Sequence, residues 1–284
     1  MWLSTTIADV RRRRRAEAGT VAFVPTMGAL HEGHIALVEH GHRVADHVVV
    51  SIFVNPTQFG PHEDFHKYPR PLERDLAMCE AAGVAGVFNP PVEEMYPPHA
   101  PACEVNVPML TADLEAAARP GHFAGVCRVV AKLLNIVQPD VACFGMKDYQ
   151  QLQVVTAMVR DLNMPVAILP CPTVREPDGL AMSSRNRYLD AEQRRRATGL
   201  AKALEQARML VEDAGEADPA TVEAAMRQVI VAHRFDRIDY ATVRHPHTLA
   251  TLDAIEPALT GGVVALVAAR LGPTRLLDNR VLGG

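Results

Sequence analysis

Short apolar runs alternate with helical patterns from residue 21 to residue 169, and this alternation limits the possible folds more than any other feature. The expected strands are residues 21–24, 47–54, 84–88, 141–144 and 165–169. The expected helices lie between them, at residues 32–43, 72–82, 125–137 and 149–161. Strands that alternate with helices form parallel β-α-β units with right-handed crossovers. The pattern therefore predicts an α/β fold with a Rossmann-like, doubly wound parallel sheet.

The second part of the chain has a different character. Two amphipathic helical stretches precede two strand-like runs, at residues 191–213, 219–233, 238–243 and 263–268. The joining segment, residues 170–190, is too polar and too rich in proline and glycine for a core. We therefore expect a larger domain over residues 1–174 and a smaller C-terminal α+β lid domain over residues 175–284.

Charge and cysteine content narrow the class of protein. The 284 residues carry a net charge of −4 with a pI near 6.3, which argues against a general nucleic-acid binder. The arginine block at residues 11–15 is better interpreted as a solvated helix face than as a nucleic-acid arm. The five cysteines are widely spaced without a Cys-x-x-Cys pair, so we expect reduced, mostly buried thiols. No apolar run approaches the roughly 20 residues of a membrane span, so we expect a cytoplasmic protein.

Residues 25–34, PTMGALHEGH, directly follow the first expected strand. A loop that leads from a strand into a helix attracts anions, through its free amides and through the helix N-terminus. His31 and His34 lie three residues apart and so share one face near that terminus. Gly28 would let the backbone approach a ligand closely, and Gly33 would leave room for an adenine. The segment favours a nucleotide triphosphate site, with two solvated surface histidines as the alternative.

Polar motifs also follow three other expected strands. The residues concerned are Asn55, Gln58, Gly145, Met146, Lys147, Asp148, Gln151, Met182, Ser183, Ser184 and Arg185. In open α/β sheets, ligands bind in the crevice beyond the carboxyl ends of the strands. We therefore expect the four motifs to converge on one site.

Each motif suits a particular part of phosphate or acid chemistry. Histidine rings donate hydrogen bonds to phosphate oxygens, more strongly when protonated, and Lys147 supplies a compact cation at a helix start. The Ser-Ser-Arg run lies on a mobile-looking loop, which suits a lid that grips leaving pyrophosphate. Gln58 and Gln151 can hold a small polar acid through their amides. Taken alone, Lys147 could instead be a solvated surface lysine. Gln58 and Gln151 could instead be buried side chains that bind only neighbouring backbone groups.

Two of these motifs resemble signatures of the adenylyl-transferring superfamily, since HEGH is similar to its HIGH motif and MSSR to its KMSKS-type loop. The combination PTMGALHEGH, FVNPTQF, YPR, RPGHFAGV, FGxKDYQQ and TVREPDGLAMSSRNRYL resembles the pantothenate synthetase (pantoate–β-alanine ligase) family. The match runs from about residue 21 to residue 189, with weaker similarity through IDYATV and AARLGPTRLLDN. The resemblance implies a two-step ligation in pantothenate and coenzyme A biosynthesis. ATP and pantoate would give a pantoyl-adenylate and pyrophosphate, and β-alanine would then attack the acyl carbon to give pantothenate and AMP.

The resemblance also implies roles for individual residues. His34 would be the catalytic proton donor, and the catalytic group would further include His31, Lys147, Ser183, Ser184 and Arg185. ATP would contact Met27, Gly28, Ala29, Leu30, His31, Glu32, Gly33, His34, Gly145, Met146, Lys147, Asp148, Val174, Met182, Ser183, Ser184 and Arg185. Pantoate would bind at Gln58 and Gln151, with Asn55, Tyr68, Arg119 and His122 lining the same cavity.

The resemblance further implies the cofactor and the assembly. Mg²⁺ would travel with ATP, and Asp75 is a candidate outer ligand. Because Arg74 stands where some relatives have another carboxylate, no protein metal site is expected. Met146 stands where the family usually has glutamate, which removes a charge beside Lys147. A homodimer is expected, without nucleic-acid or membrane partners.

Three other functions compete with this interpretation. A related nucleotidyltransferase would lack the paired glutamines and would release a stable dinucleotide. A Rossmann dehydrogenase is disfavoured because no Gly-x-Gly-x-x-Gly follows the first strand. A nucleotide sensor without enzymatic activity would not need both Lys147 and the Ser-Ser-Arg run.

Overall fold

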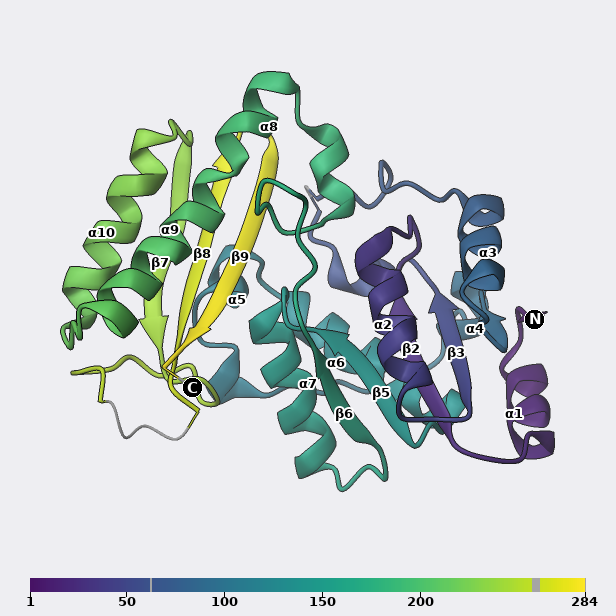
Figure 1. Cartoon of the computed structure of the whole chain (residues 1–284). Helices are drawn as coiled ribbons and strands as arrows, with labels where there is room; N and C mark the ends of the chain where they lie inside the picture. Colours follow the sequence, from purple (N-terminus) through teal and green to yellow (C-terminus); the bar gives the residue numbers. More distant parts are fainter. Residues whose placement is uncertain (62, 257–260, 284) are drawn as a thin grey trace. The chain divides into compact units, whose positions relative to one another are not determined.

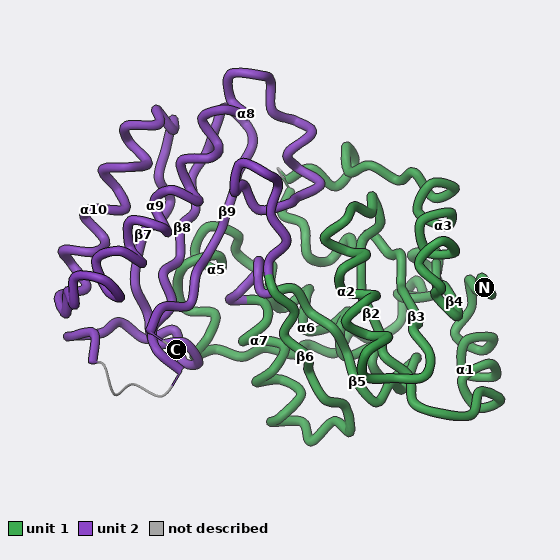
Figure 2. The backbone as a smooth tube through the Cα atoms, viewed as in Figure 1, with its two compact units in different colours: residues 1–145, 151–172 green, residues 146–150, 173–284 purple. Residues whose placement is uncertain are grey.

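The structure is a computed structural model that describes residues 1–61, 63–256 and 261–283 (Figure 1). The chain forms two compact units (Figure 2). The first contains residues 1–145 and 151–172, and the second contains residues 146–150 and 173–284. The expected division into domains at residue 174 stays a prediction.

A six-stranded, all-parallel sheet forms the centre of the first unit (Figure 1). Its strands are β1 (Trp2–Ser4), β2 (Val21–Thr26), β3 (His47–Ile52), β4 (Gly86–Phe88), β5 (Val141–Gly145) and β6 (Ala167–Cys171). They lie in the order β1-β4-β3-β2-β5-β6. The predicted α/β fold with a parallel sheet is therefore confirmed.

Burial on both faces explains why these strands are continuous apolar runs. Successive side chains of a strand point to opposite faces. In β2, Ala22 and Val24 pack into one core cluster with Val38 of helix α2 (Glu32–His42), while Val21 and Phe23 are equally buried. Neither face of the central strand is therefore left to solvent.

Helices connect these strands. They are α1 (Ile7–Ala16), α2 (Glu32–His42), α3 (Leu72–Ala81), α4 (Val92–Met95), α5 (Glu115–Ala118), α6 (His122–Val137) and α7 (Tyr149–Asp161), with 3-10 turns η1 (Pro56–Gln58) and η2 (Pro108–Leu110). The four that the sequence predicted correspond to α2, α3, α6 and α7, while the short α4 and α5 were not predicted. The arginine block at residues 11–15 lies on α1 with every side chain exposed or half-buried, which confirms a helix face. The cysteines are free thiols, four buried and Cys103 exposed.

The second unit places two long helices against a three-stranded antiparallel sheet, β7-β8-β9. Its elements are η3 (Ser184–Tyr188), α8 (Ala191–Ala197), α9 (Gly199–Arg208), a π-helical turn (Met209–Asp213), α10 (Pro219–Ala232), β7 (Arg237–Arg244), β8 (Val263–Leu271) and β9 (Thr274–Leu282). Alternate residues of β8 pack with Leu204, Met226 and Ile230 in one apolar core. The predicted smaller α+β part is confirmed.

The structure corrects several expected elements. The single helix expected over residues 191–213 is divided into α8, α9 and a π-helical turn. Strands β1 and β9 were not predicted, and β6 begins two residues later than expected. Among the described residues, no helix combines the length and apolarity that crossing a membrane requires.

Candidate active site

The strand order reverses beside β2, which pairs with β3 on one side and β5 on the other. In doubly wound sheets such a reversal opens a crevice at the carboxyl ends of the strands, where ligands bind. The loop into α2 leaves β2 at this edge, and the loop that carries Lys147 leaves β5 beside it. The topology thus supports the position expected for the site.

His31 and His34 form a reciprocal cap at the start of α2. His31 Nδ1 accepts from the Gly33 amide at 3.2 Å, and His34 Nδ1 accepts from the His31 amide at 3.3 Å. The two ring centroids are 4.2 Å apart, which confirms that the histidines lie together. A ring nitrogen that accepts a hydrogen bond carries no proton, so each ring in this arrangement holds its proton on Nε2. The motif therefore provides two Nε2–H donors.

The amides of the loop before α2 are not free, contrary to expectation. The carboxylate of Asp75 accepts from the Ala29 amide at 2.7 Å and from the Leu30 amide at 2.8 Å. The Gly28 amide donates to Thr26 Oγ1 at 3.1 Å. The backbone of this loop is therefore satisfied within the protein, and any phosphate contact falls mainly to side chains.

Asp75 also changes the roles expected for two other residues. It is 1% exposed, and both of its oxygens accept backbone amides, so Asp75 braces the loop, while its expected role as an outer Mg²⁺ ligand stays a prediction. Gly28 has a φ of +80°, and a Cβ there would lie 2.9 Å from the Asp75 carboxylate. The positive φ and the nearby carboxylate therefore already require a glycine here, and its expected approach to a ligand stays a prediction. Among the described residues, no group of three or more His, Cys, Asp or Glu side chains is placed to hold a metal ion.

Asn55 organises the buried polar group that follows β3. Its amide Nδ2 donates to Gln58 Oε1 at 3.0 Å and to the Gly125 carbonyl at 3.1 Å. Its Oδ1 accepts from the hydroxyls of Thr57 and Tyr96, each at 2.9 Å. These contacts fix the orientation of the Gln58 amide, and the Gln58 Nε2 lies 3.1 Å from the sulfur of Met27.

Gly125 permits the close approach of α6 to η1. A Cβ at this position would lie 2.2 Å from the Thr57 carbonyl oxygen, so no other residue fits without moving the backbone. The RPGHFAGV motif therefore contains a packing requirement that the sequence did not reveal.

Arg119 and His122 form a second polar group around the backbone of Gln58. His122 Nε2 lies 2.9 Å from an Arg119 nitrogen, which only donates, so Nε2 accepts and Nδ1–H donates to the Gln58 carbonyl at 2.9 Å. Burial, assisted by the charge of Arg119, lowers the pKa of His122 to about 4. Glu63 accepts two hydrogen bonds from Arg119 at 2.8 and 2.6 Å. Burial alone would raise the pKa of Glu63, but Arg119 outweighs it and the pKa is lowered.

The remaining candidates of the first unit are Tyr68 and Gln151. Tyr68 is 5% exposed, with its ring centroid 6.1 Å from that of Phe59. Gln151 is half-buried in the first turn of α7. Hydrogen bonds thus join Asn55, Gln58, Arg119 and His122, while Tyr68 and Gln151 belong to the same unit.

The lysine loop belongs to the second unit. It runs from the end of β5 at Gly145 to the start of α7. Lys147 Nζ lies 3.6 Å from the exposed carboxylate of Asp148. The carbonyls of Met146 and Lys147 accept hydrogen bonds from Asn279 Nδ2 on β9 at 2.8 and 2.7 Å. Sequence reasoning did not include Asn279 among the candidate site residues.

The Ser-Ser-Arg run lies on a loop that is internally braced. The Met182 amide donates to the Val174 carbonyl at 2.9 Å, and Ser183 caps η3 by accepting from the Arg185 amide at 3.3 Å. Asn186 then donates to Glu176 at 2.8 Å. Arg194 binds Glu176 and Asp178 at 2.5 and 2.7 Å. Hydrogen bonds and ion pairs thus brace this loop, and its expected role as a lid stays a prediction.

The candidate residues fall into one group in each unit. The first unit holds Met27, Gly28, Ala29, Leu30, His31, Glu32, Gly33, His34, Asn55, Gln58, Tyr68, Arg119, His122, Gly145 and Gln151. The second holds Met146, Lys147, Asp148, Val174, Met182, Ser183, Ser184 and Arg185. Candidate phosphate-binding donors thus occur in both groups, while the candidate acid-binding amides belong to the first.

The sequence is similar to a known family over nearly its whole length. Residues 3–281 match the family described as pantoate-beta-alanine ligase. A pantothenate synthetase of Chloroflexus aurantiacus is 53% identical over 279 residues, which cover 98% of this chain and 97% of the relative. A pantothenate synthetase of Moorella thermoacetica is 52% identical over 285 residues and covers 99% of each chain.

Solved structures agree with the sequence comparison. Pantothenate synthetase from Thermus thermophilus has a TM-score of 0.92 at 48% identity, with 99% of both chains covered. Pantoate-beta-alanine ligase from Francisella tularensis, complexed with beta-gamma ATP and beta-alanine, has a TM-score of 0.80 at 30% identity and covers 99% of this chain and 97% of its own. The chain therefore belongs to the pantoate–β-alanine ligase family.

Proposed function

We propose that this chain joins pantoate to β-alanine in an ATP-dependent reaction that forms pantothenate, AMP and pyrophosphate. The match to the family over residues 3–281 is the observation that carries this proposal. The site supports it, because two histidine donors lie at the switch point of the sheet and a buried amide group lies in the same unit.

In the first step, a pantoate carboxylate oxygen attacks the α-phosphorus of ATP, and the bond to pyrophosphate breaks. Negative charge grows on the phosphates, and fixed donors stabilise it. We assign this role to the Nε2–H groups of His31 and His34, with Lys147. The hydroxyls of Ser183 and Ser184 and the guanidinium of Arg185 would complete the phosphate contacts.

His34 acts in this scheme as a neutral hydrogen-bond donor. Its Nδ1 accepts from the His31 amide, so protonation of the ring at Nδ1 would break the cap at the start of α2. A neutral imidazole stabilises a phosphate charge through Nε2–H without releasing a proton. The proton-donor role implied by the resemblance is thus narrowed to donation of a hydrogen bond.

In the second step, the neutral amine of β-alanine attacks the acyl carbon of the pantoyl-adenylate. The new C–N bond forms, the bond from the acyl carbon to the AMP oxygen breaks so that AMP leaves, and the proton that the amine loses passes to water. Gln58 and Gln151 would hold pantoate, and Asn55 would keep the Gln58 amide in one orientation. Tyr68, Arg119 and His122 would line the same cavity.

The proposal extends to the metal, the assembly and the compartment. Mg²⁺ would travel with ATP and would neutralise part of the phosphate charge. Asp75 is committed to the loop amides, so we assign it no contact with the ion. We further propose a homodimer in the cytoplasm.

A product assay tests the function. The chain is incubated with ATP, Mg²⁺, pantoate and β-alanine, and pantothenate and AMP are measured by mass spectrometry. Equal amounts of both products are expected, and omission of any substrate should abolish pantothenate. A stable dinucleotide would favour a nucleotidyltransferase instead, and nucleotide binding without turnover would favour a sensor.

A further inference from the structure

Asn279 on β9 contacts the backbone on both sides of Lys147. Its Nδ2 group donates to the carbonyl of Met146 at 2.8 Å and to the carbonyl of Lys147 at 2.7 Å. Both protons of the amide are thereby used. Asn279 is only 5% exposed, so water does not compete freely for these contacts.

These two carbonyls have a particular position in the chain. They belong to the peptide planes that precede and follow the Cα atom of Lys147. Because a peptide unit is planar, fixing both planes fixes the two backbone torsions of Lys147 and so the direction in which its side chain leaves. The carbonyls also lie before α7, which begins at Tyr149, so the helix offers them no partner.

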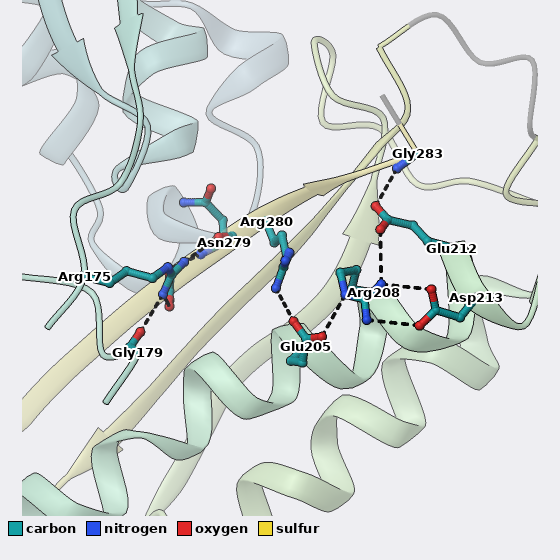
Figure 3. A network of polar contacts seen from close by, with 10 residues as sticks. Arg175, Gly179, Glu205, Arg208, Glu212, Asp213, Asn279, Arg280 and Gly283 are labelled. Atoms are coloured by element: carbon teal, nitrogen blue, oxygen red, sulfur yellow. Dashed lines mark hydrogen bonds and ion pairs between the residues drawn. The ribbon is translucent and has the colours of Figure 1, made fainter. Parts of the chain in front are cut away.

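Asn279 is itself firmly held. Its backbone amide donates to Asp278 Oδ1 at 2.8 Å. Asn279 also lies opposite Leu266 of β8 in the register of the sheet. Asp278 is 2% exposed and accepts two hydrogen bonds from Arg175, at 2.6 and 3.0 Å. Arg175 also donates to the Gly179 carbonyl at 2.9 Å (Figure 3). The side chain that holds the lysine loop is thus anchored on a strand that pairs with β8 along its whole length.

We propose that Asn279 is a positioning residue for the adenylation step and acts through Lys147. It holds the backbone of Lys147 so that the ammonium group meets the phosphates of ATP. The proposal rests on the phosphate-binding role proposed above for Lys147. A purely structural residue would stabilise the unit without affecting the chemistry of Lys147.

A double-mutant cycle on the full chain separates these two possibilities. Lys147→Ala should lower kcat by about 10²- to 10³-fold, as expected for the loss of one transition-state donor. Asn279→Ala should lower kcat by between about tenfold and about a hundredfold, because a misplacement of about 1 Å has an effect of that size. The KM for pantoate should change by less than about twofold, since the proposed pantoate residues belong to the first unit. In the Lys147→Ala background, Asn279→Ala should lower kcat further by less than about twofold.

Three other variants complete the test. The Asn279→Asp side chain has the same shape but no hydrogen-bond donor, so the kcat of this variant should match that of Asn279→Ala. If Asn279→Ala does not fold, Asn279→Ser replaces it in the cycle. A serine hydroxyl can donate to only one of the two carbonyls, so the kcat of this variant should lie between those of Asn279→Ala and the unaltered chain. Arg280→Ala is the matched control, because Arg280 is the next residue of β9 and contacts Glu205 at 2.5 Å (Figure 3). It should leave kcat within about twofold of the unaltered chain.

The outcomes distinguish this inference from the proposed function. If the unaltered chain makes no pantothenate, the proposed function fails. If it does, and the losses from Lys147→Ala and Asn279→Ala multiply, then Asn279 acts independently of Lys147 and the positioning role is refuted. Full activity of Asn279→Asp would refute it as well.

Discussion

Replacing Asp75 with alanine tests whether the loop before α2 is held by this carboxylate. The side chain is 1% exposed and accepts the amides of Ala29 and Leu30 at 2.7 and 2.8 Å. Asp75→Ala leaves both amides buried without a partner, and each costs about 1–3 kcal/mol. The free energy of unfolding should therefore fall by about 2–6 kcal/mol, a large part of the about 5–15 kcal/mol typical of a folded protein. Asp75→Asn keeps one acceptor oxygen, so its loss should be about half as large.

The measurement combines urea denaturation with hydrogen exchange of a peptide that covers residues 27–34. The amides of Ala29 and Leu30 should exchange faster in both variants, most in Asp75→Ala. Because His31 follows the loop directly, kcat at saturating ATP should fall as well. Arg74→Ala is the matched control, since Arg74 is the exposed neighbour on α3. If Asp75→Ala were as stable as Arg74→Ala, and exchange were unchanged, the loop would not depend on this carboxylate.

Three further substitutions give predictions that differ in kind. For His122, the pKa is about 4 in the folded chain and 6.5 in the unfolded reference, so the unfolded state binds more protons between these values. The free energy of unfolding should therefore fall by up to about 3 kcal/mol as the pH falls through that window. His122→Asn retains a donor for the Gln58 carbonyl but does not titrate there, so a plot of its unfolding free energy against pH should be flatter in this range. His34→Ala should lower kcat about 10²- to 10³-fold in a pyrophosphate-release assay with an unchanged circular dichroism spectrum, and near-native turnover would remove His34 from the mechanism. Met146→Glu should change kcat by less than about tenfold, because the hydrogen bond from Asn279 uses the backbone carbonyl of Met146 and not its side chain. A gain in kcat of about a hundredfold, or about 2.7 kcal/mol, would show that the methionine stands in place of a catalytic group.

The sheet was predictable because its signal is local. Strands β2, β3 and β5 are apolar on both faces, and each is followed by a helical pattern, so their parallel arrangement follows from the sequence. Strand β9 was not predictable, because Arg275, Asp278 and Arg280 interrupt the alternation of apolar residues along it. Its pairing with β8 over the whole strand determines its conformation instead.

The candidate site was predictable in its residue types and less so in its contacts. HEGH indicated two histidines on one face, and they do lie together. Asp75 follows Ala29 by 46 positions and Leu30 by 45 positions in the sequence. The contact between Asn279 and Lys147 spans 132 positions. Such contacts depend on the strand order, which no local pattern reveals. Asp75 was noticed as a carboxylate near ATP, but only its hydrogen bonds show that it serves the backbone.

Isotope exchange between pyrophosphate and ATP tests the two-step reaction most directly. With ATP, Mg²⁺ and pantoate, labelled pyrophosphate should enter ATP, because the first step is reversible and needs no amine. With β-alanine in place of pantoate, no label should enter ATP. Exchange that required β-alanine, or that proceeded without pantoate, would contradict a pantoyl-adenylate intermediate.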